Sequence, residues 1–286
     1  MRASTAVLTD TSVRLWDLEF PSSRALLART RSAYVHVDNL IAFSKRDRDG
    51  KVDAYLATYL PDEVVLLFFL GGDLINAAVL TSAGRYQAAI SEAMRRIRTE
   101  PERSEMSFHE APREQLAAMY ASCSQPPQQL GLDPTSAETL FGGLMERRWS
   151  GLLEIIARGA VNYITVREGK FASGLFVERR PDDKPQTCVA RLFATAPGEA
   201  RARVGAKAYL GLSAMPVQAP PPMVNMFRHF VWDLVELAER EMPNDATKRA
   251  ERVRMRLLPE HEPLASVGGA RGAEFADPIV EPPVLA

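Results

Sequence analysis

The apolar and polar positions in the middle of the chain follow the pattern of one short helix and three strands. Leu140, Leu144 and Met145 recur at helical spacing and no proline interrupts them, which predicts a helix over residues 138–148 with one buried stripe. The Thr-Ser pair at 135–136 is well placed to cap the first turn of this helix.

Three strands are expected directly after this helix. Residues 150–156 form a mostly apolar run interrupted only by Glu154, residues 161–167 alternate between two faces, and residues 171–177 follow a second tight turn. Each turn contains a glycine that can supply a positive φ angle. The pattern therefore predicts a three-stranded antiparallel meander.

A similar pattern precedes this stretch and indicates a tandem repeat. Residues 32–37 can be aligned with residues 150–155, which lie 118 positions further on, and residues 72–80 with residues 169–177, which lie 97 positions further on. The first module would then carry 21 extra residues, which we expect in an extended hairpin with a polar tip at residues 44–51.

These motifs carry a resemblance to the bacterial PATAN-type domain. The shared pattern is a helix ending in R-x-x-G-x-L, a strand, and a turn of the form G-x-h-x-x-A/S. It is matched in the second module by Arg148, Gly151, Leu153, Gly169 and Ser173, and in the first module by Gly72, Asn76 and Ala77. The resemblance covers residues 22–110 and 135–215. It implies a non-enzymatic adaptor of bacterial signalling, of a kind found beside response-regulator or gliding-motility components.

Further elements of the first module are expected from local signals. A proline at its start favours a helix over residues 21–31. The remaining elements are hairpin strands over 34–44 and 51–59, a strand over 64–69 covered on both faces, a strand over 74–80, a helix over 84–99, an edge strand over 106–109 and a helix over 113–122.

Downstream of the meander we expect a strand over 187–195, a helix over 199–209, a long amphipathic helix over 223–241 and a last helix to residue 258. The fold class is therefore α+β, with two tandem helix-plus-antiparallel-sheet modules. The expected division is a first module with its extended hairpin (1–122), a linker (123–134), a second module (135–215), C-terminal helices (216–258) and a flexible tail (259–286).

Composition excludes several function classes. The chain has 286 residues with a net charge of −1, so it has no global field that would attract nucleic acid or an anionic membrane. The longest apolar runs are far shorter than the roughly 20 residues of a membrane span, and no apolar leader is present. Cys123 and Cys188 are expected as free thiols in a reducing, cytoplasmic location.

No constellation of residues points to catalysis, a cofactor or a metal. The four histidines, His36, His109, His229 and His261, do not occur at metal-ligand spacing. The chain also lacks a nucleophile elbow and a phosphate-binding glycine loop. The acidic stretch 47–50 lacks the carboxylates that a calcium loop needs at its first and last ligand positions. The protein is therefore not expected to be an enzyme.

Two features instead indicate a protein interface. One is the set of small arginine clusters containing Arg95, Arg147 and Arg148. The other is the stripe of the long C-terminal helix, which suits either core packing or a partner groove. Its members are Met223, Met226, Phe227, Phe230 and Leu234.

The favoured function is a non-enzymatic signalling or regulatory adaptor that binds another protein or forms a homodimer. The first alternative is a small-molecule sensor with a pocket between the two modules. The second is a roadblock-like regulator of a small GTPase, since that fold also pairs helices with an antiparallel sheet. A deep pocket with inward polar groups would favour the sensor, and a flat apolar patch would favour the adaptor.

Overall fold

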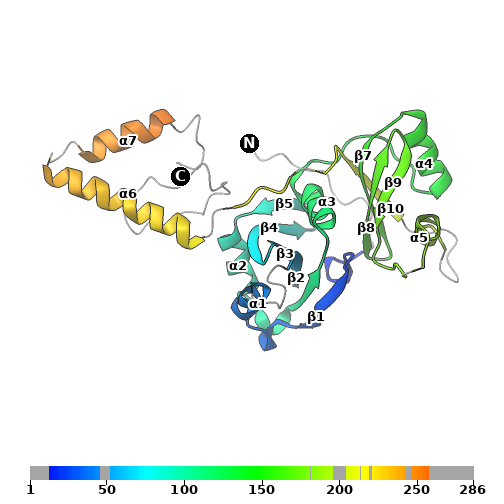
Figure 1. Cartoon of the computed structure of the whole chain (residues 1–286), viewed down its shortest axis with the longest axis horizontal. Coiled ribbons are helices and arrows are strands. Elements are labelled where there is room, and N and C mark those ends of the chain that lie inside the picture. The colour runs from blue at the N-terminus through cyan, green and yellow to red at the C-terminus, as the bar shows by residue number, and fades with distance from the viewer. Residues whose placement is uncertain are drawn as a thin grey trace.

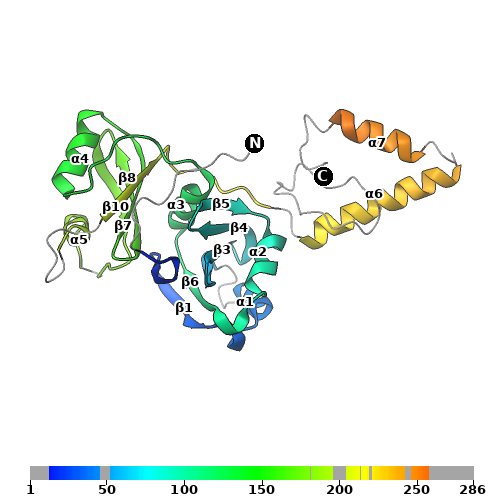
Figure 2. The same ribbon diagram turned by 180° about the vertical axis from the view of Figure 1, so that it is seen from behind.

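The computed structural model describes residues 13–45, 52–180, 182–195, 204–212, 214–218, 221–241 and 246–257. These residues form helices, two antiparallel sheets and the loops that connect them (Figures 1 and 2). The fold therefore belongs to the expected α+β class. The first sheet has the strand order β1-β6-β2-β3-β4-β5 and the second β10-β7-β8-β9.

The strands are β1 (Arg24–Arg31), β2 (Ala54–Tyr59), β3 (Glu63–Leu70), β4 (Asp73–Thr81), β5 (Gly84–Ala88), β6 (Glu105–Glu110), β7 (Gly151–Ala157), β8 (Ala160–Arg167), β9 (Lys170–Leu175) and β10 (Val204–Tyr209). The α-helices are α1 (Val37–Ser44), α2 (Ile90–Ile97), α3 (Arg113–Ser124), α4 (Ala137–Glu146), α5 (Pro185–Leu192), α6 (Pro221–Glu241) and α7 (Ala246–Leu257). Short 3-10 turns lie at Leu15–Asp17, Ser32–Tyr34 and Pro101–Arg103.

The helices and sheets alternate in layers. Helices α1 and α2 cover the outer face of the first sheet, α4 and α5 cover the outer face of the second, and α3 lies between the two inner faces (Figure 1). The even-numbered side chains of the apolar run 64–69 in β3 face α3, and the odd-numbered ones face α1 and α2. This confirms the predicted strand that is covered on both faces.

The two sheets repeat the same order of elements. Each unit consists of a helix, three meander strands, a second helix and a returning strand. In the first sheet these elements are α1, β2, β3, β4, α2 and β6, and in the second they are α4, β7, β8, β9, α5 and β10. Strands β3 and β8 begin 97 residues apart (63 and 160) and end 97 residues apart (70 and 167). The register shift between Phe68 and Phe69 recurs at the same separation, between Thr165 and Val166.

The alignment of residues 72–80 with 169–177 therefore matches equivalent turns, but the alignment of residues 32–37 with 150–155 is wrong. Residue 54, at the start of β2, is the structural counterpart of Gly151 at the start of β7, which is the same 97-residue separation. The residues before α1 have no place in the repeat, so the 21 extra residues are not a hairpin insertion.

In each meander one turn glycine packs closely against the helix that precedes the meander. Gly72 and Gly169 have φ angles of +81° and +77°, and each donates its N–H to an equivalent carbonyl, that of Val52 and that of Trp149. A Cβ on Gly72 would lie 2.6 Å from the carbonyl oxygen of Ser44, and one on Gly169 would overlap the backbone of Met145. Both positions therefore require glycine for backbone angle and for space.

Several local predictions for the first module are wrong. Residues 24–31 of the predicted helix 21–31 form strand β1, because pairing with β6 satisfies their backbone groups and overrides the helix propensity of their leucines and arginines. Residues 34–44 form a 3-10 turn and helix α1 instead of a hairpin strand. The predicted edge strand over 106–109 is β6, which lies inside the sheet between β1 and β2.

Three other segments exchange helix and strand. The predicted helix 84–99 is split into β5, which pairs with β4, and α2. The predicted strand 187–195 is helix α5, which begins with a proline in its first turn. Residues 204–209 of the predicted helix 199–209 are strand β10, because they complete the edge of the second sheet beside β7.

Other predictions are confirmed. Helix α4 is capped by Ser136, whose hydroxyl accepts the Thr139 N–H at 3.1 Å, and the meander β7-β8-β9 follows it. The predicted helices 113–122, 223–241 and the last helix correspond to α3, α6 and α7. Cys123 and Cys188 are buried free thiols. The hairpin tip at residues 46–51 and the tail from residue 258 lie outside the described residues.

The Gly72 turn provides a stability test with a matched neighbour. Gly71 also has a positive φ angle, +57°, but a Cβ there would meet no atom within 4 Å. We expect Gly71→Ala to lower the free energy of unfolding by about 1–2 kcal/mol through backbone strain. Gly72→Ala should lower it by a further 1–3 kcal/mol, roughly the cost of overpacking, measured by urea denaturation. Equal losses would contradict the close approach to α1.

Candidate functional site

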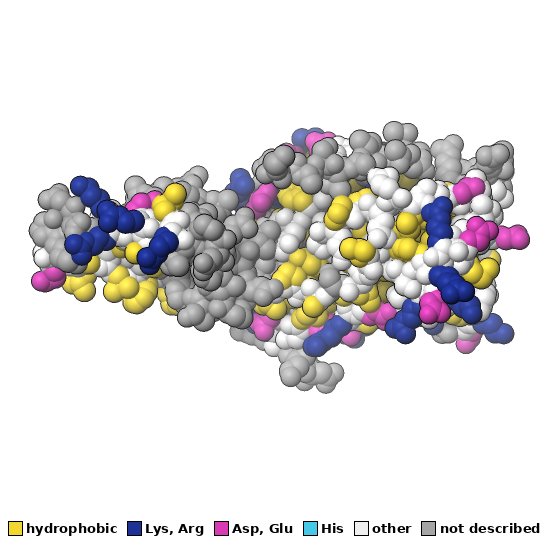
Figure 3. All heavy atoms as spheres, turned by 90° about the horizontal axis from the view of Figure 1, so that it is seen from above, with side chains coloured by type: hydrophobic (Ala, Val, Ile, Leu, Met, Phe, Trp, Pro, Cys, Tyr) yellow, Lys and Arg dark blue, Asp and Glu magenta, His cyan; other side chains and the backbone are white. Residues whose placement is uncertain are grey.

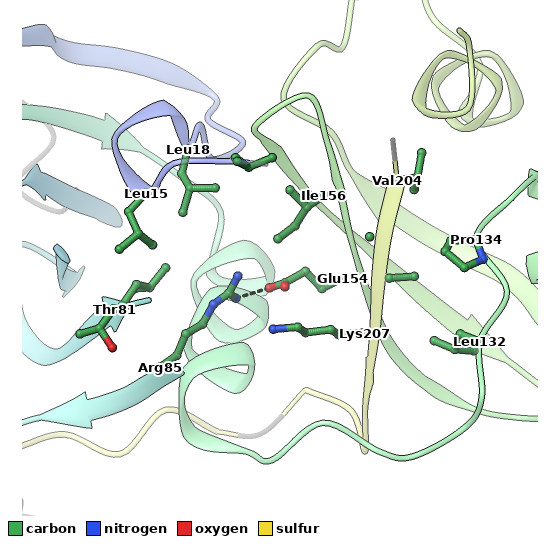
Figure 4. A pocket seen from close by; sticks show the side chains of 14 residues that line it. Leu15, Leu18, Thr81, Arg85, Leu132, Pro134, Glu154, Ile156, Val204 and Lys207 are labelled. Carbon is green, nitrogen blue, oxygen red and sulfur yellow. Dashed lines mark hydrogen bonds and ion pairs between the residues drawn. The ribbon is translucent and has the colours of Figure 1, made fainter. Parts of the chain in front are cut away.

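A pocket of about 320 Å³ opens where the two sheets meet (Figure 4). Strands β4 and β5 of the first sheet and β7 and β10 of the second contribute to it, together with the N-terminal residues 13–18 and the loop 132–134. The wall consists of Val13, Leu15, Leu18, Leu80, Thr81, Arg85, Leu132, Pro134, Glu154, Ile156, Val204, Gly205, Ala206 and Lys207. The pocket lies between the two sheets.

A buried ion pair crosses this pocket from one sheet to the other. Arg85 comes from β5 and Glu154 from β7, and their side chains are 7% and 0% exposed. Arg85 Nη1 donates to Glu154 Oε2 and, at 3.1 Å, to Ser122 Oγ on α3 (Figure 4). The pair therefore links both sheets and the helix between them.

Strand alternation accounts for the position of the charged groups. Glu154 lies between Leu152 and Ile156 on the inner face of β7, where its neighbours in the alternation are apolar. Lys207 of β10 is the direct cross-strand partner of Glu154, so both side chains project toward Arg85 (Figure 4).

Hydrogen-bonding capacity is left over on both sides of the ion pair. Glu154 Oε1 is buried and has no hydrogen-bond partner. Within the described residues, Arg85 uses only Nη1, and the Lys207 ammonium has no hydrogen-bond or ion-pair partner. Two cations face one carboxylate, so the site has an excess of one positive charge.

Burial and mutual charge set the protonation states. Burial, reinforced by the charge of Arg85, lowers the pKa of Lys207 although Glu154 acts in the opposite direction. For Arg85 burial is the largest single influence and would lower the pKa, but Glu154 together with Tyr209, Tyr163 and Cys123 outweighs it, so the pKa is raised. Burial raises the pKa of the neighbouring Cys123 thiol to about 11. Arg85 therefore stays protonated, the excess positive charge of the site is that of Lys207, and Cys123 is not a reactive thiolate.

Apolar side chains complete the wall beside the charged groups. Leu15 and Leu18 of the N-terminal segment face Ile156 of β7 above the ion pair in Figure 4. A pocket with a mostly apolar wall and a few convergent polar groups has the usual composition of a small-molecule site. The arrangement is thus suited to bind a small molecule with one charged end and one aliphatic end.

A second, larger hollow lies between α1, α2 and the start of β4, with a volume of about 1270 Å³. Its cations are mostly paired already: Arg98 contacts Asp38, Arg113 contacts Asp53 and Lys45 contacts Asp73 at 2.9–3.0 Å. Neutralised charges in an open hollow give less basis for selecting a ligand than the pocket between the sheets.

The residues predicted for an interface occupy separate places. Arg95 is exposed on α2 at the second hollow. Arg147 donates to the carbonyl of Leu130, and Arg148 is exposed at the end of α4. Met226, Phe230 and Leu234 are exposed on α6, while Met223 and Phe227 lie in the same helix with side chains outside the described set.

The predicted motif residues are structural. Asn76 and Ala77 are buried in β4, and Gly151 starts β7 where a Cβ would meet Trp149 and Tyr209. Ser173 lies in β9 and donates to Glu114 Oε1 at 2.8 Å. Together with Gly72 and Gly169, they position the meanders and do not line the pocket.

The sequence pattern does not bring the charged residues of the pocket together, because it predicts the wrong elements for two of them. It predicts Arg85 at the start of a helix and Lys207 within another helix, whereas both lie in strands. The one signal in the sequence is Glu154, since a carboxylate in an otherwise apolar strand must be exposed, paired or functional.

Comparisons of the chain with protein-family models, curated proteins and solved structures gave no match. Across the described residues, no group of three or more His, Cys, Asp or Glu side chains is arranged to hold a metal ion. In the same part of the chain, no helix is both long and apolar enough to cross a membrane.

The buried ion pair is open to a double-mutant cycle. Arg85→Met or Glu154→Gln should each lower the free energy of unfolding by about 3–5 kcal/mol, because each leaves an uncompensated buried charge. The double variant Arg85→Met/Glu154→Gln should lose less than the sum of the two single variants, as measured by urea denaturation. As a control, removing the exposed Arg98 that pairs with Asp38 should cost about 0–1 kcal/mol. Additive losses at the buried pair would contradict a direct coupling.

Proposed function

We propose that this chain is a non-catalytic regulatory adaptor that works through protein–protein contacts, with its C-terminal helical hairpin as the docking element. The hairpin consists of α6 and α7 and projects away from the sheets (Figures 1 and 2). Both the Thr247 N–H and its hydroxyl donate to Glu239 Oε2, which joins the two helices. The proposal agrees with the resemblance to PATAN-type adaptors.

One observation carries this proposal: α6 exposes an apolar stripe. Met226, Phe230, Leu234 and Leu237 are 60%, 57%, 48% and 56% exposed. Their spacing of four, four and three residues places them on one side of the helix, as in a helix–helix seam. In the view from above, hydrophobic side chains line one edge of the hairpin (Figure 3). An exposed stripe of this kind marks an interaction surface.

The occupant that we propose is a second molecule of this chain, and the charge pattern of the hairpin is compatible with it. Helix α7 carries five Lys or Arg residues against one Glu, whereas the second half of α6 carries Asp233, Glu236, Glu239 and Glu241 against one Arg. A symmetric dimer can bring the acidic helix of one hairpin beside the basic helix of the other. The two apolar stripes then form the centre of a four-helix bundle.

A buried polar strap holds the segment that precedes α6 against the first sheet. Gln218, three residues before α6, donates to Asn76 Oδ1 at 2.7 Å and accepts the N–H of Ile90 at the start of α2. Asn76 in turn donates to the carbonyl of Pro216 at 2.7 Å. The strap therefore ties residues 216 and 218 to the first sheet and α2, three residues before α6 begins.

The pocket between the sheets supports a second candidate function, the sensing of a small molecule. Its polar groups point inward and have unused hydrogen-bonding capacity, which is the feature that distinguishes a sensor from a plain adaptor. The roadblock-like alternative stays a prediction.

The adaptor proposal is tested by the oligomeric state of the full chain. We expect sedimentation velocity to give a dimer for the natural chain and a monomer for Phe230→Asp/Leu234→Asp, because two carboxylates cannot be buried in an apolar seam. The melting temperature of the sheets should not change, since the stripe is exposed.

Met145→Asp is the matched control, because Met145 is 55% exposed but lies on α4, and this variant should remain a dimer. A natural chain that stays monomeric at all concentrations would refute dimerisation through the hairpin. A dimer that survives in Phe230→Asp/Leu234→Asp would place the contact elsewhere.

A further inference from the structure

We infer that the pocket between the two sheets binds a small aliphatic hydroxy acid, with the carboxylate on Lys207 and Arg85, the hydroxyl on Glu154 and the alkyl chain against Leu15, Leu18 and Ile156. The inference rests on the second candidate function, ligand sensing, and is independent of dimerisation. Three features of the pocket carry it: its excess charge, its unused hydrogen-bonding atoms and its apolar side.

The excess charge selects an anion. One carboxylate of the ligand would neutralise the positive charge that Arg85 and Lys207 leave over beside Glu154. Charge-assisted hydrogen bonds to ammonium and guanidinium groups are the strong ones in proteins, and burial strengthens them further. A neutral ligand would leave that charge uncompensated in a site whose ion pair is almost fully buried.

The free oxygen of the carboxylate selects a hydrogen-bond donor on the ligand. Glu154 Oε1 is buried without a partner, and such an atom loses its hydration without compensation. A hydroxyl next to the ligand carboxylate can donate to it without adding a charge. An ammonium group could also donate, but it would restore the excess positive charge that the carboxylate removes.

The volume and the apolar wall limit the rest of the ligand. A pocket of about 320 Å³ is at the lower end of small-molecule sites. Leu15, Leu18 and Ile156 lie on the side away from Lys207 in Figure 4, so a short branched alkyl chain would be buried there.

The pocket can be filled from within by a side chain at Gly205. This residue lies two positions before Lys207 in β10, and its ideal Cβ would meet no atom within 4 Å. Its φ angle is outside the left-handed region, so Gly205→Leu adds no backbone strain. Gly142 of α4 likewise has no atom within 4 Å of an ideal Cβ and does not line the pocket, so Gly142→Leu is the matched control.

The test is titration calorimetry of the full chain with leucic acid, isocaproic acid, leucine and inorganic phosphate. The first three probes share the same branched alkyl chain and carboxylate. Leucic acid adds a hydroxyl, leucine adds an ammonium group and isocaproic acid adds neither. Phosphate supplies negative charge without an alkyl chain. We expect leucic acid to bind at least about tenfold more tightly than each of the other three, because only it satisfies both the cations and Glu154.

Variants locate the binding. Binding of leucic acid should be lost in Gly205→Leu and retained in Gly142→Leu. Lys207→Met should weaken it at least about tenfold. In the natural chain we expect the affinity to fall at alkaline pH, because Lys207 gives up its proton there. Burial lowers the pKa of Lys207, which lies beside Arg85, Glu154 and Cys123. Lys207→Met should remove this alkaline loss of affinity. If Gly205→Leu does not fold, Lys207→Met and its pH profile decide the question.

Three outcomes would overturn the inference. The first is the absence of binding by any probe to the folded chain. The second is binding that persists unchanged in both Gly205→Leu and Lys207→Met, which would place it outside the pocket. The third is tighter binding of leucine or phosphate than of leucic acid, which would assign a different ligand class. Sedimentation of the same samples separates these outcomes from a failure of dimerisation.

Discussion

The two sheets bury their inner faces in one shared core, and the positions of all other elements follow from it. Helix α3 fills the space between the sheets, and from Gln115 to Cys123 every residue except Ala117 is buried. Small side chains such as Ala118 and Ala121 let the sheets approach the helix closely. Since both inner faces are covered in this way, each sheet needs only its own pair of helices on the outside.

The ion pair of Arg85 and Glu154 lies at the rim of this shared core, where apolar packing would be the more stable solution. Replacing a buried ion pair by well-packed apolar side chains is often neutral or stabilising. A third charged group, Lys207, adds to the desolvation cost at the same place. The retention of three charges and an unpaired oxygen beside an open pocket is understandable if the site binds a ligand.

The site arises from a difference between two otherwise similar halves. The meanders and their turn glycines recur in both sheets, but the first sheet carries the additional strands β1 and β5 at its edges. Strand β5 supplies Arg85, and the opposite groups come from β7 and β10 of the second sheet. Strand β10 and the strap at Gln218 both precede α6 in the chain, so the pocket and the hairpin draw on neighbouring parts of the sequence.

The sequence by itself determined the elements whose signals are strong and local. These are the apolar strand β3, the meander with Gly169, the capped helix α4 and the amphipathic helix α6. Only the tertiary structure decided short segments such as β1, β5 and β10, since pairing at a sheet edge outweighs their weak propensities. The pocket depended on those same segments, because Arg85 and Lys207 meet Glu154 only when both edges have formed.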